Sequence, residues 1–147
     1  METNKKHSSK LIVKSKTENL SLIRDFISSK ASDAGILIEE IENIMLAVDE
    51  ACTNIIKHAY HSGPGGNIIV KVEYDSADFK ITIEDYGNSF NPDEVPDPDL
   101  RQYHKDKKVG GLGMYLMKTL MDDVKYVSVP GKYNRVILSK KINVSQN

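Results

Sequence analysis

The sequence predicts a two-layer α/β sandwich, in which helices cover one face of a mixed, mostly antiparallel sheet. Two helix-like segments follow each other near the start, at about 17–34 and 37–60. Short segments of alternating apolar residues come before and after them, and turn residues join several of these segments in pairs. Because strands and helices do not alternate regularly, we expect no doubly wound parallel sheet. The length of 147 residues fits one domain, which we expect to occupy residues 1–147.

The composition excludes several classes of protein. Twenty basic and 21 acidic residues give a net charge of −1, so no overall field favours direct binding to nucleic acid or an anionic membrane. Cys52 is the only cysteine, which excludes an internal disulfide and fits a reducing compartment. The start lacks the apolar core of a signal peptide, and no apolar run reaches the ~20 residues of a membrane span. We therefore expect a cytoplasmic protein.

The N-terminal part should contain one strand and one helix. Residues 1–8 are polar and are expected to be disordered, and an alternating strand should follow at Lys10–Lys14. Thr17 is a suitable N-cap for a helix that runs to about Ala34. Gly35 should end this helix because glycine readily adopts the left-handed conformation of a C-terminal cap.

The central helix should run from about Leu37 to Tyr60, until the glycine-rich run at 62–66 ends it. Apolar residues recur along it every three or four positions, which predicts one buried face. A polar stripe lies beside that face and consists of Glu50, Asn54 and His58, each one turn after the last. A carboxylate can accept a proton and a carboxamide oxygen suits Mg²⁺, so the stripe can supply a base and a metal ligand. It can also be the solvated face of an amphipathic helix.

A hairpin should follow, with strands at Asn67–Tyr74 and Phe79–Asp85. Because side chains alternate along a strand, Asp85 should point to the core side together with the apolar residues of its strand, Phe79, Ile81 and Ile83. A buried carboxylate needs hydrogen-bonding partners, so an inward Asp85 just before Gly87 suggests a pocket that receives a donor group. A shift in strand register or an ordinary turn aspartate explains the same residues.

The stretch 88–109 contains three prolines and little apolar periodicity, as in a functional lid or a disordered insert. A glycine-rich run follows and leads into a helix that reaches about Met121. This run consists of Gly110, Gly111, Leu112 and Gly113. Glycines before a helix N-terminus suit phosphate binding, although a flexible hinge has the same composition. The last two strands are expected at Val124–Val129 and Asn134–Ile142.

Three motifs occur in a fixed order: Glu50 one turn before Asn54, Asp85 just before Gly87, and the glycine-rich run before the next helix. Together they resemble those of the Bergerat-fold ATPases, a superfamily that includes histidine kinases and type II topoisomerases. Glu50 and Asn54 match the N box, Asp85 and Gly87 the first glycine box, and the run at 111–113 the second. The resemblance implies that Asp85 accepts from the adenine amino group of ATP and that Gly87 lets the base approach. It further implies that Asn54 holds Mg²⁺, Glu50 is the base, Gly110–Gly113 line the phosphates and 88–109 is the ATP lid.

Within that superfamily, the segments 49–60 and 111–117 are most similar to the anti-sigma-factor serine/threonine kinases of bacterial partner-switching systems. Histidine kinases commonly carry asparagine where this chain has Glu50. A carboxylate suits a hydroxyl or water acceptor, which must lose a proton. The resemblance implies a kinase that binds a sigma factor and phosphorylates an anti-sigma-factor antagonist. It also implies a homodimer, because relatives dimerise and a one-sided helical layer leaves one sheet face uncovered.

The chain departs from the superfamily in the lid, where residues 101–108 lack the Phe-Thr-Thr motif of some relatives. Arg101, Lys107 or Lys108 could contact the γ-phosphate, or this run could be a solvated charged segment. Two alternative functions therefore remain at the level of sequence. One is a nucleotide-dependent binding module that switches partners without phosphoryl transfer, and the other is an ATPase subunit in which Glu50 acts on water.

Overall fold

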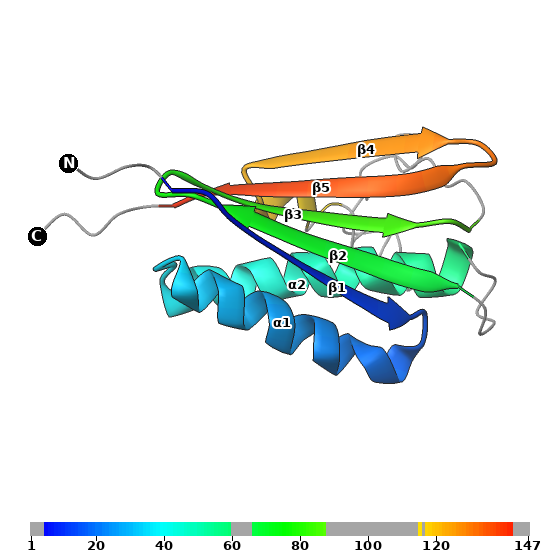
Figure 1. Ribbon diagram of the computed structural model, residues 1–147, viewed down its shortest axis with the longest axis horizontal. Coiled ribbons are helices and arrows are strands. Elements are labelled where there is room, and N and C mark those ends of the chain that lie inside the picture. Colours follow the sequence, from blue (N-terminus) through cyan, green and yellow to red (C-terminus); the bar gives the residue numbers. More distant parts are fainter. Residues whose placement is uncertain (1–4, 60–65, 88–114, 116, 143–147) are drawn as a thin grey trace, which may run out of the picture.

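The computed structural model describes residues 5–59, 66–87, 115 and 117–142. In this part of the chain, five strands form one sheet and two long helices cover one of its faces (Figure 1). This arrangement confirms the two-layer α/β sandwich. The elements are β1 His7–Lys14, η1 Thr17–Asn19, α1 Leu20–Asp33, α2 Ile38–Asn54, η2 Ile55–Ala59, β2 Asn67–Tyr74, β3 Asp78–Asp85, β4 Asp123–Val129 and β5 Tyr133–Lys141.

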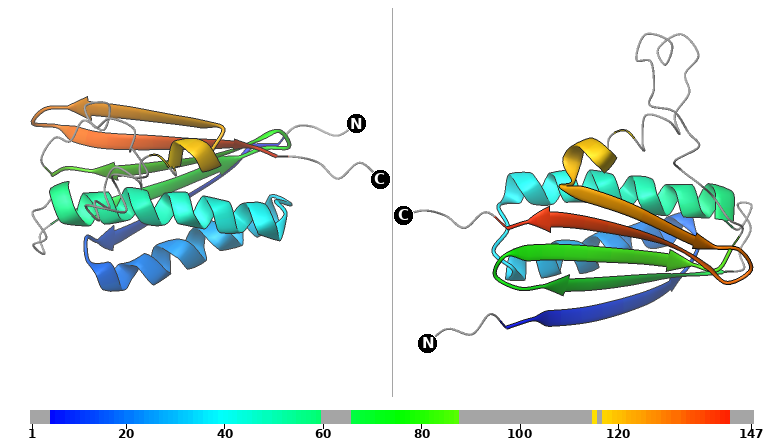
Figure 2. Two further views of the ribbon diagram at one scale, coloured as in Figure 1. Left: turned by 180° about the vertical axis from the view of Figure 1, so that it is seen from behind. Right: turned by 90° about the horizontal axis from the view of Figure 1, so that it is seen from above.

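The sheet has the strand order β1-β2-β3-β5-β4, and Figure 2 shows β5 between β3 and β4. All four pairs of neighbouring strands are antiparallel. The predicted mostly antiparallel sheet is therefore confirmed, but the described strands include no parallel neighbours that would make it mixed. The reason is the position of β5. Strands β3 and β4 run in the same direction, and β5 separates them and pairs with both.

The first strand is longer than the sequence predicts. β1 begins at His7, whereas residues 1–8 were expected to be disordered. That expectation is wrong for His7 and Ser8, which pair with Tyr74 and Glu73 of β2. The His7 ring also stacks on Tyr74 with 4.6 Å between the ring centroids. Pairing with β2 therefore orders residues that carry no local strand signal.

The first helix starts differently from the predicted cap. Thr17 is the first residue of the 3₁₀ turn η1, and α1 starts after it at Leu20, with Asn19 in the N-cap position. No side chain caps either element. The Asn19 side chain instead donates to the Lys14 carbonyl at 2.8 Å, which ties the start of the helix to the end of β1. The expectation that Thr17 is the cap is wrong.

The predicted end of this helix is confirmed. Gly35 has φ +85°, in the left-handed region that glycine adopts without a steric penalty. Its N–H donates to the Ser32 carbonyl at 3.0 Å, and the N–H of Ile36 donates to the Ala31 carbonyl at 3.1 Å. This pair of hydrogen bonds is the Schellman motif. The motif turns the chain so that α2 can run back alongside α1.

The second helix contains the predicted polar stripe and ends in an irregular turn. α2 runs from Ile38 to Asn54 and continues as the π-helical turn η2, Ile55–Ala59. The predicted helix is confirmed up to residue 59, and Tyr60 lies outside the described residues. Single π-helical turns occur often at functional sites. Here the turn begins directly after Asn54.

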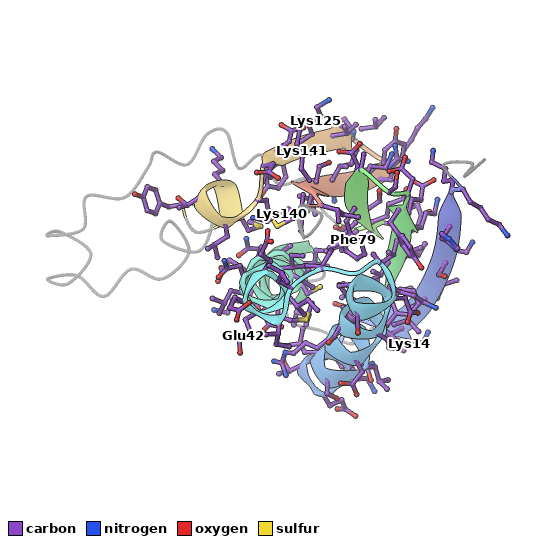
Figure 3. All side chains as sticks on the ribbon, turned by 90° about the vertical axis from the view of Figure 1, so that its left-hand side faces the viewer. Lys14, Glu42, Phe79, Lys125, Lys140 and Lys141 are labelled. Atoms are coloured by element: carbon purple, nitrogen blue, oxygen red, sulfur yellow. The ribbon has the colours of Figure 1, made fainter. Side chains whose placement is uncertain are left out.

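The core lies between the sheet and the helices, where Phe79 of β3 points toward the helical layer (Figure 3). The apolar stripe of α2 packs against the inward rows of β2 and β3. The fully buried residues of this core include Ile44 and Val48 of α2, Ile68 and Val70 of β2, and Ile81 and Ile83 of β3. Residues 117–120 form a further helical turn, and Lys140 Nζ of β5 donates to the Leu120 carbonyl at 3.0 Å. In the described part of the chain, no helix is both long and apolar enough to cross a membrane.

Candidate active site

A cavity of about 40 Å³ lies where the end of α2 meets the end of β3 and the β4–β5 hairpin. Two residues that the sequence singled out, Asn54 and Asp85, both line it. The rest of the lining includes Ala51, Ile55, Ile83 and Asn134. The cavity has room for only a few water molecules or the edge of a ligand. Because its lining is mostly apolar, the cavity suits a ligand that presents one polar edge to Asn54 and Asp85.

Asp85 ends β3 and points inward, as the alternation predicted. It pairs with Asn134 of β5 and is only 3% exposed. It lies in the same inward row as the buried Ile81 and Ile83, so the alternative of a shifted register is wrong. The turn interpretation is also partly right, because the Gly87 N–H donates to Asp85 Oδ1 at 2.9 Å. Asp85 thus both shapes the turn and presents a carboxylate to the cavity.

A chain of hydrogen bonds from the β4–β5 hairpin holds this carboxylate in place. Asn134 Nδ2 donates to Asp85 Oδ1 at 2.9 Å and to the Gly87 carbonyl at 3.3 Å. Ser128 Oγ donates to Asn134 Oδ1 at 2.6 Å. Neither bond to Asp85 uses Oδ2. Sequence reasoning missed Asn134 and Ser128, because only the strand register brings them to Asp85.

The environment of Asp85 makes its ionised form less favourable than in water. Burial raises the pKa of this carboxyl, and the hydrogen bonds from Asn134 and Gly87 partly oppose that rise. A buried acceptor of this kind gains when a ligand brings a donor group to it. The site is therefore suited to an amino or amide N–H of a ligand.

Asn54 is the last residue of α2 and is 8% exposed, and it lines the same cavity. The described residues contain no cluster of three or more His, Cys, Asp or Glu side chains that could hold a metal ion by themselves. Mg²⁺ bound to a nucleotide needs only one or two protein oxygens, because phosphates and water complete its shell. A single carboxamide at the cavity fits that mode of binding and does not fit a metal site made by the protein alone.

Glu50 lies on α2, one turn before Asn54, and is half-buried. It is not one of the described residues that line the cavity. Burial raises the pKa of its carboxyl, the positive charge of Lys57 lowers it, and the negative charge of Asp49 raises it. A raised pKa makes the carboxylate a stronger base than an exposed glutamate.

The other predicted site residues cannot be placed. Gly110, Gly111, Leu112 and Gly113 lie outside the described residues, as do the lid 88–109 and its three basic candidates. The side chain of His58 is also outside the described part. Cys52 is fully buried, and burial raises the pKa of its thiol to about 12, so the thiol stays neutral. Cys52 is therefore a small core residue.

Comparison with known proteins supplies an independent observation. The model of the histidine kinase-like ATPase domain matches residues 13–140. The chain is 36% identical over 131 residues to the serine-protein kinase RsbW of Bacillus velezensis, covering 86% of this chain and 80% of the relative. It is 36% identical over 135 residues to RsbW of Listeria monocytogenes, with 89% and 85% covered. The corresponding values for RsbW of Bacillus subtilis are 35% over 136 residues, with 89% and 83% covered.

Proposed function

The chain belongs to the histidine kinase-like ATPase family, and we propose that it is an ATP-dependent serine/threonine protein kinase that acts as an anti-sigma factor. The resemblance inferred from its three motifs is confirmed by the family match and by relatives that are serine-protein kinases. The observation that carries the proposal is the meeting of Asn54 and Asp85 at one cavity, with Glu50 one turn earlier on α2.

In the proposed reaction, Asp85 accepts a hydrogen bond from the exocyclic amino group of adenine. The bonds from Gly87 and Asn134 hold the carboxylate still for this contact. This amino group distinguishes adenine from hypoxanthine and guanine, which carry a carbonyl oxygen on the same ring carbon. Gly87 lets the base come close to the backbone, and Gly110–Gly113 contact the phosphates through their N–H groups.

Glu50 accepts the proton of the attacking serine hydroxyl. The hydroxyl oxygen forms a bond to the γ-phosphorus of ATP as the bond from that phosphorus to the bridging oxygen breaks, which leaves ADP. Asn54 would hold the Mg²⁺ of the bound nucleotide. When bound, the ion neutralises the negative charge of the phosphates. The spacing of one helical turn lets one rigid helix position both side chains.

The proposed partners are a sigma factor and an anti-sigma-factor antagonist. The kinase binds the sigma factor and phosphorylates a serine of the antagonist, and the phosphorylation state of the antagonist decides which partner it holds. The names of the relatives support the kinase activity. The switching role is supported by the resemblance of segments 49–60 and 111–117 to the anti-sigma-factor kinases. A partner of this kind places the reaction in the cytoplasm and requires no direct contact with nucleic acid.

The test is incubation of the full chain with γ-labelled ATP, Mg²⁺ and candidate small antagonist domains. Label on an antagonist serine supports the proposal. Release of free phosphate with no labelled protein would instead identify an ATPase in which Glu50 acts on water. Nucleotide-dependent exchange of partners without transfer or hydrolysis would identify a binding module.

Asn54→Ala should weaken Mg-nucleotide binding and phosphoryl transfer together, each by roughly tenfold or more. The reason is that the metal contacts the phosphates in the ground state as well as in the transition state. Calorimetry with Mg-ADP and a single-turnover transfer assay measure the two effects. The variant should bind metal-free ADP about as well as the parent. Loss of transfer with unchanged Mg-ADP affinity would remove Asn54 from the metal site.

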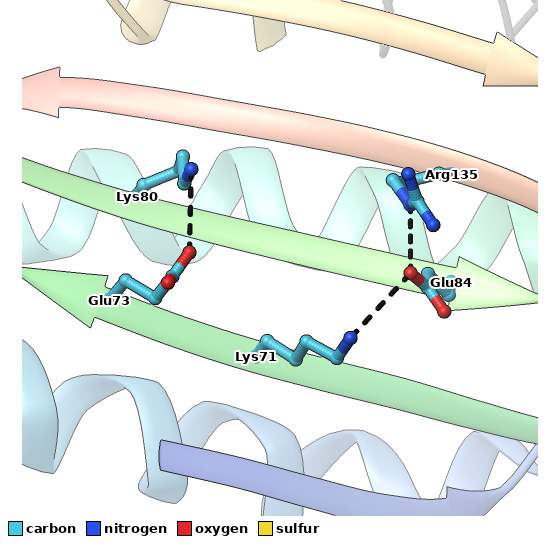
Figure 4. A network of polar contacts seen from close by, with 5 residues as sticks. All are labelled: Lys71, Glu73, Lys80, Glu84 and Arg135. Carbon is cyan, nitrogen blue, oxygen red and sulfur yellow. Dashed lines mark hydrogen bonds and ion pairs between the residues drawn. The ribbon is translucent and has the colours of Figure 1, made fainter. Parts of the chain in front are cut away.

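We also propose a homodimer that buries the sheet face opposite the helices. On this face the Glu84 carboxylate lies between Arg135 at 2.8 Å and Lys71 at 3.9 Å, and Lys80 pairs with Glu73 at 3.3 Å (Figure 4). The row that contains Glu84 and Arg135 continues across the sheet to apolar residues at its two edge strands. These are Ile12, which is 53% exposed, and Val127, which is 36% exposed. A second copy of the same face would cover them.

Ile12→Lys should convert a dimer into a monomer, because a charge at the edge of the interface opposes burial of that row. Light scattering at micromolar concentration measures the mass. Leu22→Lys is a matched control, since Leu22 is equally exposed but lies on α1 of the helical face. A parent protein with the mass of a monomer would contradict the dimer. A dimer that survives Ile12→Lys would contradict this interface.

A further inference from the structure

An ion pair joins the two helices next to Glu50. Arg24 of α1 donates from Nε to Asp49 Oδ1 of α2 at 2.8 Å, and Asp49 directly precedes Glu50 in the chain. The helices run side by side on the same face of the sheet (Figure 1). The pair is partly open to solvent, with 45% of the Arg24 side chain and 33% of the Asp49 side chain exposed. Asp49 begins the segment 49–60 that carries the family resemblance, whereas Arg24 belongs to none of the sequence motifs.

The charges that act on Glu50 are those of Lys57 and Asp49, and Arg24 acts on it only through Asp49. Asp49 on α2 adds a second negative charge beside the Glu50 carboxylate, and Lys57 on η2 adds a positive one. Arg24 on α1 forms an ion pair with Asp49, so its positive charge offsets the negative charge of Asp49. Without Arg24, two neighbouring carboxylates would repel each other, which favours the protonated and inactive form of a base.

We propose that the Arg24–Asp49 ion pair balances the charge at Glu50, so that α1 acts as a positioning element for the proposed catalytic base. The inference rests on the proposed function, in which Glu50 takes the proton of the acceptor serine. Arg24 has two effects in this arrangement. It cancels the charge of Asp49, and it ties the part of α2 that contains Glu50 to the neighbouring helix.

The test compares Arg24→Gln, Asp49→Asn and the double variant in the pH dependence of transfer. Asp49→Asn leaves the positive charge of Arg24 uncompensated, so the acidic limb of the profile should move to lower pH. Arg24→Gln leaves the negative charge of Asp49, so the limb should move to higher pH. Each shift should be roughly half a pH unit, as expected for one charge at short range near solvent. The double variant removes both charges and should return the limb close to its original position.

A second measurement does not depend on kinase activity. Carbon-13 NMR of the Glu50 side-chain carboxyl follows its titration directly in the nucleotide-free protein and should show the same opposite shifts. In about 1 M salt the shifts should shrink, because exposed charges are screened. If the parent transfers no phosphate, the proposed kinase fails, while the NMR titration still decides whether the pair balances the charge at Glu50.

Glu42→Gln provides a control. Glu42 is exposed on the same helix two turns before Glu50. Its loss should leave the acidic limb and the Glu50 titration unchanged. Shifts of the same sign in both Arg24→Gln and Asp49→Asn, or no recovery in the double variant, would overturn the proposal. So would a loss of rate without any shift, which would mean that the pair only fastens α1 to α2.

Discussion

Glu50→Gln should lower the rate of phosphoryl transfer to an antagonist serine by roughly 100-fold or more, the usual scale for loss of a general base. Glutamine keeps the shape and hydrogen-bonding capacity of the side chain but cannot take the proton. Nucleotide affinity should barely change, because Glu50 is not among the described residues that line the cavity. Single-turnover assays with labelled ATP measure the rate, and calorimetry with Mg-ADP measures the affinity.

The matched control is Glu42→Gln. Glu42 is exposed on the same helix two turns before Glu50 (Figure 3), and its loss should leave the rate unchanged. Transfer by Glu50→Gln at the rate of the parent would remove Glu50 from the role of base. An equal loss in Glu42→Gln would point to a general effect of charge on α2.

The pH dependence gives a second readout of the same variant. A base must be ionised, so transfer should fall as the pH falls through the pKa of Glu50. Burial raises that pKa above its ordinary value of 4.5, so the acidic limb should lie above pH 4.5. The residual activity of Glu50→Gln should lack this limb. A limb that persists unchanged would belong to another group.

Asp85→Asn should weaken ADP binding by about 1–3 kcal/mol, or roughly 5- to 150-fold, as expected for loss of a charged hydrogen bond in a buried site. The amide keeps an oxygen for the Gly87 and Asn134 donors but replaces the second carboxylate oxygen with a donor. That donor would face the adenine amino group, which is also a donor, so the hydrogen bond would be lost. Calorimetry on both proteins decides the outcome, with the exposed Asp78→Asn at the other end of β3 as the control. Equal ADP affinities would exclude the proposed role of Asp85.

The same substitution should make the nucleotide-free protein more stable at pH 7. The pKa of Asp85 is raised in the folded protein, so its ionised form is less favourable there than in the unfolded chain. Its contribution to stability is fully present below the unfolded pKa and is lost as the pH rises through the folded pKa. Urea unfolding should show the advantage of Asp85→Asn at pH 7, and the advantage should shrink below pH 3.8. No advantage at pH 7 would mean that the surrounding donors already compensate for burial.

The sequence by itself determined most of the elements and the positions of Asp85 and Asn54 within them. The alternation in β3 put Asp85 in the inward row, and the helical period put Asn54 one turn after Glu50. The left-handed Gly35 ended α1 where expected. These features depend on the local chemistry of a few neighbouring residues, and a periodic pattern reports local chemistry well. The phosphate-binding role of the glycine-rich run at 110–113 also rests on a local sequence pattern, and it remains a prediction.

Only the tertiary structure decided what depends on partners that are distant in sequence. The pairing with β2 extended β1 to His7, and the position of β5 between β3 and β4 made the described sheet antiparallel throughout. The same register brought Asn134 to Asp85, and the packing of α1 on α2 brought Arg24 to Asp49. None of these residues has a local pattern that identifies its partner. Strand order and helix packing follow from burying the whole core at once, so such contacts become visible only when the chain is folded.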